Sequence, residues 1–451
     1  MKKNLFYYAL ALALMGGVSS CSDEDEVEII PDLTVTIQGQ EGVSEMAVGD
    51  TLQLTAHMTG ADKVTYNWTL NGQSAGTDSV YKFIPTELAE YRIEATVSDG
   101  TRKATSSASI RVHGKYRDGI FVLNEGAAWQ GDKGGSLTFI SPKGYVTPTA
   151  FQAENNGAWL GGVPQDLFIK SNKLYVVTQN GGNEGGILTI MNAETLKLEQ
   201  AFQAEDFEGI SWPTHVVVSD EFIAFLRDNT GIWAFDPSTK QAKFIEGTQG
   251  ARKNTMAIIK DKVFAANGKN VMVIDAKSQS VASTIEFDSN VSGVIPASDG
   301  NLWVSTSSSK ISKVNATDYQ IVQTNDLSSQ EGISSALSAS FAAAPSITAK
   351  GDTLYMSGLS TKIYRHIFSK GETKLMVDAK TMIENAGVVY NTVAVDPQTG
   401  LVYMNTIKGY SDVGINQITG FDFSGGEPQI KVAYNNYTRF PAGTFFTANF
   451  K

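Results

Sequence analysis

The residue types that most often perform chemistry are sparse in this chain of 451 residues. Its 4 histidines are scattered, and no His-Glu-x-x-His spacing, which sets two metal ligands on one helix face, occurs. A Gly-x-Ser-x-Gly nucleophile elbow is also absent. The glycine-rich stretch 181–186 lacks the following helix and lysine of a phosphate cradle. The sequence therefore predicts no catalytic constellation, no metal site and no bound cofactor.

Two carboxylates in predicted loops, Glu125 and Glu184, keep a second interpretation open. Carboxylates that converge can bind calcium or act as an acid and base pair. Acidic residues in loops are more often simply solvated. A converging Glu, Asn and Asp ring would favour an enzyme.

Aromatic and amide side chains are concentrated in the longer predicted loops, where they suit ligand binding. Aromatic planes stack on a ligand, and polar groups orient it. The candidate ligand-binding residues are Asn124, Glu125, Trp129, Trp159, Asn183, Trp212, Arg227, Arg252, Tyr410 and Tyr437. Two alternatives apply: Trp159 and Trp212 wedge between neighbouring sheets, and Asn124 stabilises a turn.

The elements that must position these residues form a repeat. A unit of four short strands with tight polar turns recurs through the region 116–451 at spacings of about 37 to 54 residues. Its six copies begin near Pro164, Pro213, Asn254, Val291, Pro345 and Tyr390. This spacing is typical of four-stranded propeller blades.

A seventh unit is split between the two ends of this region. Three strands lie within 119–151, and a Pro-led strand at 440–446 supplies the fourth. Pairing them would remove exposed sheet edges. The sequence therefore predicts a seven-bladed β-propeller closed by the C-terminal strand. The competing open β-solenoid requires shorter, more uniform repeats.

Loop lengths select one face of this predicted propeller. The turns from first to second and from third to fourth strand are minimal, as at 170–172 and 260–261. The other connections are longer, as at 124–135 and 407–417. Because functional groups concentrate on loops held by a rigid scaffold, we expect the ligand site on the long-loop face and little room on the short-turn face.

The start of the chain indicates export. Lys2 and Lys3 precede an apolar run, 5–18, that is too short to span a membrane. Val18-Ser19-Ser20-Cys21 resembles a bacterial lipobox, so residues 1–20 are expected to be a signal peptide and Cys21 the lipidation site; the alternative is a buried free cysteine. Residues 21–32 then form an acylated acidic tether. Its acidic cluster resembles the surface-export signal of Bacteroidota lipoproteins, although a plain spacer is the alternative.

The segment 33–114 alternates polar and apolar residues with period two, which indicates an antiparallel β-sandwich around Trp68. Its stretches 66–72 and 91–100 resemble PKD and Ig-like modules, which commonly act as spacers. The whole chain is thus expected to be all-β, with an Ig/PKD-like sandwich before the propeller.

Composition excludes several classes. Lys and Arg number 36 against 47 Asp and Glu, a net charge of −11, and no long basic run occurs, so nucleic acid is not an expected partner. The single cysteine excludes an intramolecular disulfide framework.

The stretch Phe121-Val122-Leu123-Asn124-Glu125-Gly126, followed by Gly135-Ser136-Leu137, resembles the YncE-like seven-bladed propellers of Bacteroidota surface lipoproteins. That resemblance covers about three quarters of the chain and includes the corrinoid-capturing BtuG group. It implies a lipid-anchored, outward-facing protein of the outer membrane that captures a nutrient such as cobalamin for a TonB-dependent transporter. Two other classes remain open: a hydrolase, lactonase or quinone-dependent enzyme, and an adhesion or scaffold protein.

Overall fold

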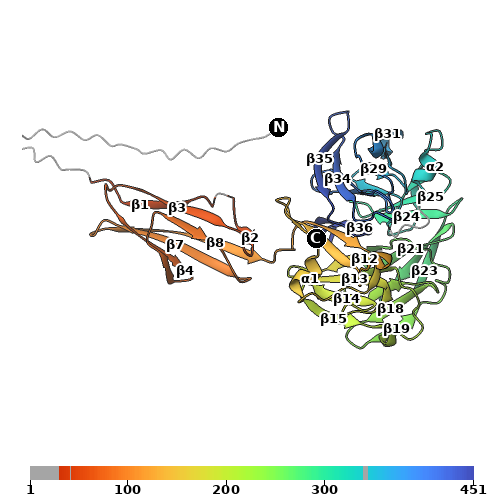
Figure 1. Cartoon of the computed structure of the whole chain (residues 1–451), viewed down its shortest axis with the longest axis horizontal. Coiled ribbons are helices and arrows are strands. Elements are labelled where there is room, and N and C mark those ends of the chain that lie inside the picture. Colours follow the sequence, from red (N-terminus) through yellow and green to blue (C-terminus); the bar gives the residue numbers. More distant parts are fainter. Residues whose placement is uncertain (1–29, 41, 339–343, 451) are drawn as a thin grey trace, which may run out of the picture. The chain divides into compact units, whose positions relative to one another are not determined.

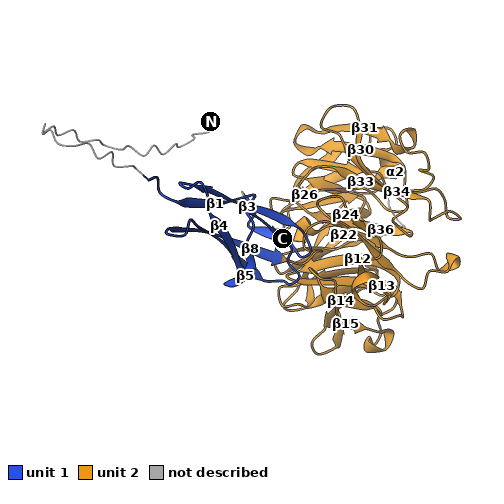
Figure 2. Cartoon of the chain, turned by 60° about the vertical axis from the view of Figure 1, so that its left-hand side comes forward, with its two compact units in different colours: residues 1–112 blue, residues 113–451 orange. Residues whose placement is uncertain are grey.

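The computed structural model describes residues 30–40, 42–338 and 344–450. The chain divides into two compact units, residues 1–112 and 113–451 (Figure 2). The predicted signal peptide and Cys21 lie outside the described residues.

The first unit packs two antiparallel sheets around one core. One sheet has the order β1 (Thr34–Gln38), β3 (Leu52–Thr59), β6 (Val80–Phe83). The other has the order β2 (Glu45–Ala47), β8 (Lys103–His113), β7 (Glu90–Ser98), β4 (Thr65–Leu70), β5 (Gln73–Gly76). Buried and exposed residues alternate along β1, β7 and β8, as expected for strands with one face in a core. Trp68 is fully buried, as predicted, and its indole Nε1 donates to the Asp78 carbonyl at 2.8 Å.

In the described part of the second unit, seven antiparallel sheets each contain four strands. Figure 1 shows them arranged around a common centre. Sheet 1 contains β36 (Pro441–Phe446), β9 (Ile120–Asn124), β10 (Ser136–Ile140) and β11 (Val146–Thr147), and sheet 2 contains β12 (Gly162–Lys170), β13 (Lys173–Gly181), β14 (Leu188–Asn192) and β15 (Leu198–Phe202). Sheet 3 contains β16 (His215–Val218), β17 (Ala224–Arg227), β18 (Ile232–Asp236) and β19 (Gln241–Phe244), and sheet 4 contains β20 (Ala257–Ile259), β21 (Lys262–Asn267), β22 (Asn270–Asp275) and β23 (Ser280–Glu286). Sheet 5 contains β24 (Val291–Pro296), β25 (Leu302–Thr306), β26 (Lys310–Val314) and β27 (Ile321–Asp326), and sheet 6 contains β28 (Thr348–Lys350), β29 (Thr353–Met356), β30 (Lys362–Ile367) and β31 (Glu372–Asp378). Sheet 7 contains β32 (Ala394–Val395), β33 (Val402–Ile407), β34 (Asn416–Asp422) and β35 (Gln429–Asn435).

Burial along the strands reflects their place in each sheet. Second strands such as β25 and β33 are buried at every position, because both faces pack against neighbouring sheets. Fourth strands such as β23 and β35 alternate between exposed and partly buried positions. The apolar cores therefore lie between the sheets, and each sheet depends on its neighbours.

The last strand of the chain completes the first sheet. β36 pairs antiparallel with β9, with Thr444 opposite Val122 and Phe445 opposite Phe121, so the predicted pairing of these two strands is present. The Asn405 amide of sheet 7 donates to the Thr444 hydroxyl at 2.8 Å. The two ends of the second unit are thus joined by a strand ladder.

One predicted strand is largely a helix. The sequence suggested a strand through 146–151, but β11 ends at Thr147 and α1 (Ala150–Glu154) follows. Phe151 is fully buried in the core beside Phe139, and one helical turn delivers it there. A second short helix, α2 (Ile333–Ala336), precedes β28. Five 3₁₀ turns complete the described structure: η1 (Ala128–Gln130), η2 (Ala204–Asp206), η3 (Phe368–Lys370), η4 (Ala379–Thr381) and η5 (Thr447–Phe450).

Candidate functional site

Hydrogen bonds connect each sheet of the second unit to the next, through residues on or near the two inner strands of each sheet. The seven links, taken in order from sheet 1, are Gln165 to Glu125, Val216 to Asp166, Arg227 to Ala251, Asn254 to Ser292, Ser346 to Ser292, Thr392 to Pro345, and Asn391 to Pro441. We call these residues the polar collar. Most residues of the collar are buried, so their hydrogen bonds are shielded from water. The collar therefore holds the starting points of the long loops in place.

Glu125 is the most unusual member of the collar. Its side chain is 8% exposed, and its Oε1 accepts a hydrogen bond from Gln165 at 2.5 Å. Burial raises the pKa of Glu125 to about 7, although hydrogen bonds from Gln165 and Tyr390 and the charge of Lys253 act in the opposite direction. Burial also disfavours the charged form of Lys253, and so it lowers the pKa of that side chain. Glu125 is therefore able to gain or lose a proton near neutral pH.

Asp166, one collar position further on, is a second buried carboxylate. It accepts backbone hydrogen bonds from Leu167 at 2.9 Å and Val216 at 3.1 Å. Burial raises its pKa to about 7, and these two donors oppose the shift. Asp166 joins sheets 2 and 3, and both carboxylate oxygens have backbone partners.

Four aromatic side chains, Trp129, Tyr390, Tyr410 and Phe440, lie beside Glu125. We call them the aromatic cluster. The Phe440 ring is at the centre of the cluster. Its centroid lies 4.2 Å from the Tyr390 ring centroid, 5.5 Å from that of Trp129 and 5.8 Å from that of Tyr410. Trp129 is 60% exposed and Tyr410 57% exposed, whereas Phe440 is buried. The cluster therefore offers two exposed aromatic surfaces on a buried aromatic support.

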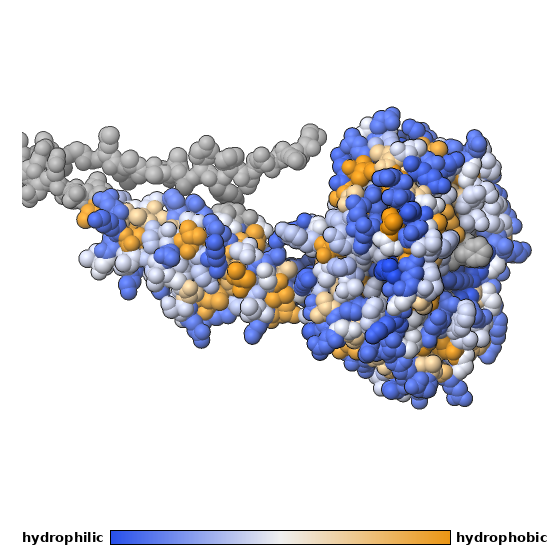
Figure 3. Space-filling model, viewed as in Figure 1, coloured by the Kyte–Doolittle hydropathy of each residue, from blue (hydrophilic) through white to orange (hydrophobic). Residues whose placement is uncertain are grey.

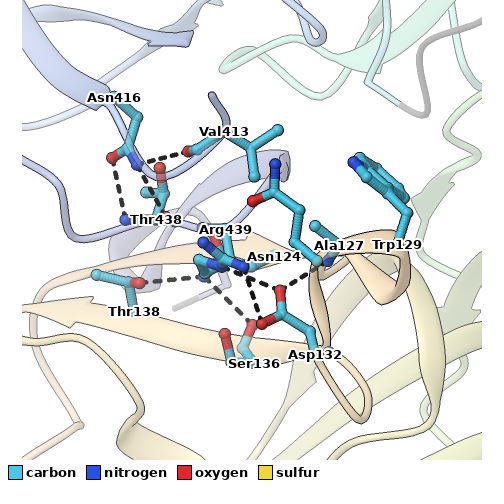
Figure 4. A network of polar contacts seen from close by, with 12 residues as sticks. Asn124, Ala127, Trp129, Asp132, Ser136, Thr138, Val413, Asn416, Thr438 and Arg439 are labelled. Atoms are coloured by element: carbon cyan, nitrogen blue, oxygen red, sulfur yellow. Dashed lines mark hydrogen bonds and ion pairs between the residues drawn. The ribbon is translucent and has the colours of Figure 1, made fainter. Parts of the chain in front are cut away.

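The loop that carries Trp129 is held by polar contacts, shown in Figure 4. Arg439 donates from Nε and Nη2 to the two Asp132 carboxylate oxygens, each at 3.0 Å. Asp132 also accepts from the Ala127 backbone at 2.7 Å. The Trp129 indole donates to the Tyr410 carbonyl at 3.2 Å. These contacts order the cluster without a ligand.

A glycine permits the close approach of sheets 1 and 2 below this loop. A Cβ at Gly135 would lie 2.0 Å from the Pro164 ring, so no larger residue fits there without displacement. Gly135 was part of the motif that carried the family resemblance.

Two collar side chains carry buried acceptors without a partner among the described residues. These atoms are Gln165 Oε1 and Asn254 Oδ1. A buried carbonyl oxygen without a donor is unfavourable, so water or a ligand group is the natural complement.

The ten predicted site residues divide into four groups. Glu125, Trp129 and Tyr410 belong to the site just described. Trp159 and Asn183 are neighbours, because Trp159 N bonds to Glu184 at 2.9 Å and the Asn183 amide donates to the Leu160 carbonyl at 3.2 Å. The Asn183 amide also donates to the Lys133 carbonyl at 2.8 Å, which links it to the loop of Trp129. The third group is Trp212, Arg252 and Tyr437, whose side chains form no hydrogen bond or ion pair with either place among the described residues; the Tyr437 carbonyl accepts from Thr138.

Asn124 and Arg227 form a fourth group, whose side chains are buried and hydrogen-bonded within the fold. Asn124 is fully buried, donates to Thr138 and accepts from the Arg439 backbone at 3.0 Å. Arg227 is 8% exposed and donates to the Ala251 carbonyl at 2.9 Å. Burial lowers the pKa of Arg227 to about 10. Their polar atoms are used in hydrogen bonds within the fold.

Several site residues were missed: Gln165, Lys253, Tyr390 and Phe440. The sequence did contain a signal for these residues. Each lies near the start of an innermost strand, and the repeats were counted from those starts. Polar or aromatic residues recurring at an inner strand start are those that meet around the centre.

The expectation of little room on the short-turn face is wrong. A cavity of about 440 Å³ lies there between sheets 6 and 7, bounded by the turns at 399–401 and 422–424. Two aromatic rings and several long side chains at the sheet edges form its walls, so turn length alone did not reveal it.

The visible surface in Figure 3 is mostly polar, with apolar residues dispersed in small groups. Within the described ranges, no group of three or more His, Cys, Asp or Glu is placed to hold a metal ion. No helix in that same part of the chain is long and apolar enough to cross a membrane.

The sheets and their order define a β-propeller-like protein. The chain belongs to the family described as a domain of unknown function (DUF5074), which matches residues 118–447.

One solved structure with a TM-score above 0.5 supports this fold. A quinoprotein alcohol dehydrogenase-like protein from Bacteroides thetaiotaomicron has a TM-score of 0.54 at 14% identity, covering 92% of this chain and 99% of that chain. The WD40 domain of Pan2 from Neurospora crassa has a TM-score of 0.41 at 11% identity, covering 59% of this chain and 78% of that chain. A comparison with curated proteins finds no match.

Proposed function

We propose that this protein is a non-catalytic, cell-surface ligand-binding lipoprotein of the Bacteroidota that captures a nutrient, with a corrinoid such as cobalamin favoured. The observation that carries the proposal is the aromatic cluster, in which Trp129 and Tyr410 are exposed yet joined at 3.2 Å. Preordered aromatic groups lose little entropy on binding a large planar ligand.

The scaffold of this proposal is a closed seven-bladed propeller. The seven four-stranded sheets, the β36–β9 ladder and a polar collar with a link at each junction support it. The first unit is proposed to be an Ig/PKD-like spacer, which its two sheets around Trp68 support.

Calorimetric titration of the purified protein with cobalamin, haem and an oligosaccharide tests the function. Trp129→Ala is expected to weaken binding of the true ligand at least about tenfold, as loss of a central aromatic contact does. Trp212→Ala is the matched control, because Trp212 is 56% exposed and outside the cluster. Equal effects of the two substitutions would contradict the proposed site.

A second function, enzymatic catalysis, is favoured by one observation. Glu125 has a pKa of about 7 and lies near Lys253 and the unpartnered Gln165 Oε1. A carboxyl group that titrates near neutrality suits general acid-base chemistry. Turnover of a lactone, or of an alcohol with added quinone cofactor, that Glu125→Gln abolishes would replace the capture proposal.

Surface anchoring through Cys21 has its own test. Wild-type cells are expected to incorporate labelled fatty acid into the protein and carry it on the outer membrane, exposed to added protease. Cys21→Ala is expected to lose both the label and the membrane association. A labelled Cys21→Ala protein would contradict the assignment.

Delivery to a TonB-dependent transporter rests on the family resemblance. Cells lacking the protein are expected to grow more slowly when cobalamin is limiting but normally when it is abundant. Identical growth under limitation would oppose this role.

A further inference from the structure

The cavity of about 440 Å³ between sheets 6 and 7 is distinct from the aromatic cluster. It lies at the short-turn face and falls within the usual size range of small-molecule sites. Its lining residues are Thr353, Tyr355, Arg365, Ile367, Thr399, Gly400, Leu401, Asp422, Phe423, Ser424 and Lys431.

One wall carries two positive side chains, Arg365 and Lys374, on neighbouring strands of sheet 6. Arg365 is directly opposite Tyr355 on one side and Lys374 on the other, so the three side chains share one face of sheet 6. Like charges directly opposite each other destabilise a sheet. Neither the Arg365 nor the Lys374 side chain forms a hydrogen bond or ion pair within residues 30–40, 42–338 and 344–450. Folding alone does not account for this pair.

The charged residues of the other wall do not cancel the positive charge of Arg365. Asp422 is the single carboxylate of the lining, and Lys431 lies 3.7 Å from it. Arg365 and Lys431 against Asp422 leave one net positive charge in the lining. At the outer strand, Lys374 is balanced by Glu372 on the same face, so the total remains one net positive charge.

The interior of the cavity also has an apolar part. Tyr355 and Phe423 stack with ring centroids 5.9 Å apart and an interplanar angle of 26°. Ile367 and Leu401 line the cavity next to them. An inorganic anion would leave this surface unused.

We propose that this cavity binds a small organic oxyanion, a carboxylate or phosphate ester with an apolar ring or chain. The Arg365 guanidinium holds the oxyanion through its paired N–H donors, and Lys374 adds charge. The apolar body of the ligand packs on Tyr355 and Phe423. The site does not depend on the capture function.

Titration of the full chain with four probes tests the proposal: benzoate, phenyl phosphate, inorganic phosphate and benzyl alcohol. Benzoate or phenyl phosphate is expected to bind, and which of them binds more tightly identifies the oxyanion. Benzyl alcohol binding as tightly as benzoate would overturn the charge recognition. Inorganic phosphate binding as tightly as phenyl phosphate would overturn the apolar recognition, and no binding by either aromatic anion would overturn the site.

Arg365→Gln is expected to weaken the bound anion by about tenfold to a hundredfold, the range for a charged hydrogen-bond partner. Lys374→Gln is expected to weaken it less. Lys362→Gln removes the same charge from an exposed position on β30 outside the cavity lining and is expected to leave affinity unchanged. An equal loss in Lys362→Gln would overturn the specific role of Arg365.

Thermal unfolding without ligand separates binding from a structural role. Removing Arg365 relieves repulsion from Lys374, so the midpoint of Arg365→Gln is expected to stay equal or rise, while benzoate no longer shifts it. A clearly lower midpoint without ligand would show that Arg365 supports the fold and would overturn the proposal.

Discussion

Asp132 and Arg439 form an ion pair with two hydrogen bonds of 3.0 Å, although 307 residues separate them in sequence. The pair fastens the loop of Trp129 to the segment that leads into β36. The position of an exposed tryptophan therefore depends on the last strand of the chain.

Asp132→Asn is expected to reduce the free energy of unfolding by about 1 kcal/mol, because a two-bond charged contact is replaced by a weaker neutral one. Urea unfolding measures this. A double-mutant cycle with Arg439→Gln is expected to show coupling, whereas Asp299→Asn, which breaks a more exposed pair with Lys313, serves as the control. Additive effects of the two substitutions would contradict a direct interaction.

Stability is expected to fall with rising pH because of Glu125. Its pKa is 4.5 in the unfolded reference and about 7 in the folded protein, so between these values the folded state holds a proton that the unfolded state has released. The folded state is therefore disfavoured as pH rises through this interval, by about 3 kcal/mol when complete.

Glu125→Gln cannot titrate, so it is expected to match the wild type near pH 5 and exceed its stability at pH 8. Asp166 contributes a decline of the same sign, which should persist in the variant. Urea unfolding across this range measures both. Parallel curves for the two proteins would oppose the burial-driven pKa shift.

Trp212 has a backbone φ of +52°, a conformation that glycine adopts freely and other residues adopt at a cost. Trp212→Gly is therefore expected to be about 1 kcal/mol more stable than Trp212→Ala. Both variants lose the same exposed ring, so calorimetric unfolding isolates the backbone effect. Equal stabilities would show that the segment relaxes to negative φ.

Deleting residues 440–451 is expected to abolish cooperative unfolding of the second unit. The deletion removes β36, exposes the edge of β9 and leaves Asn405 without Thr444. Circular dichroism and thermal melts measure the loss. The first unit offers an internal reference, since its sheets contain no residue from this segment. A second unit that still melts cooperatively would contradict the role of this strand.

The strand pattern was predictable because alternation and repeat spacing are local properties. The order of four strands per unit and the pairing of β36 with β9 followed from counting repeats. The helical turn at Phe151 was not predictable, because burial of its ring depends on residues distant in sequence, such as Phe139.

The candidate site was predictable only in part. Glu125, Trp129 and Tyr410 lie in long loops and were found by residue type. Tyr390 and Lys253 were missed because they precede strands of two different sheets. These strands lie near Glu125 only when the sheets are arranged around a common centre. The sequence left two roles open for Asn124 because it gives no measure of burial, whereas the structure shows that its amide donates to Thr138.

The ladder between β36 and β9 also determines when the protein can finish folding. The strand that fills the inner position of the first sheet follows all the strands of the other six sheets in the chain, so it is synthesised after them. Until β36 is made, the edge of β9 has no strand partner. A chain that terminates before β36 therefore cannot complete the first sheet.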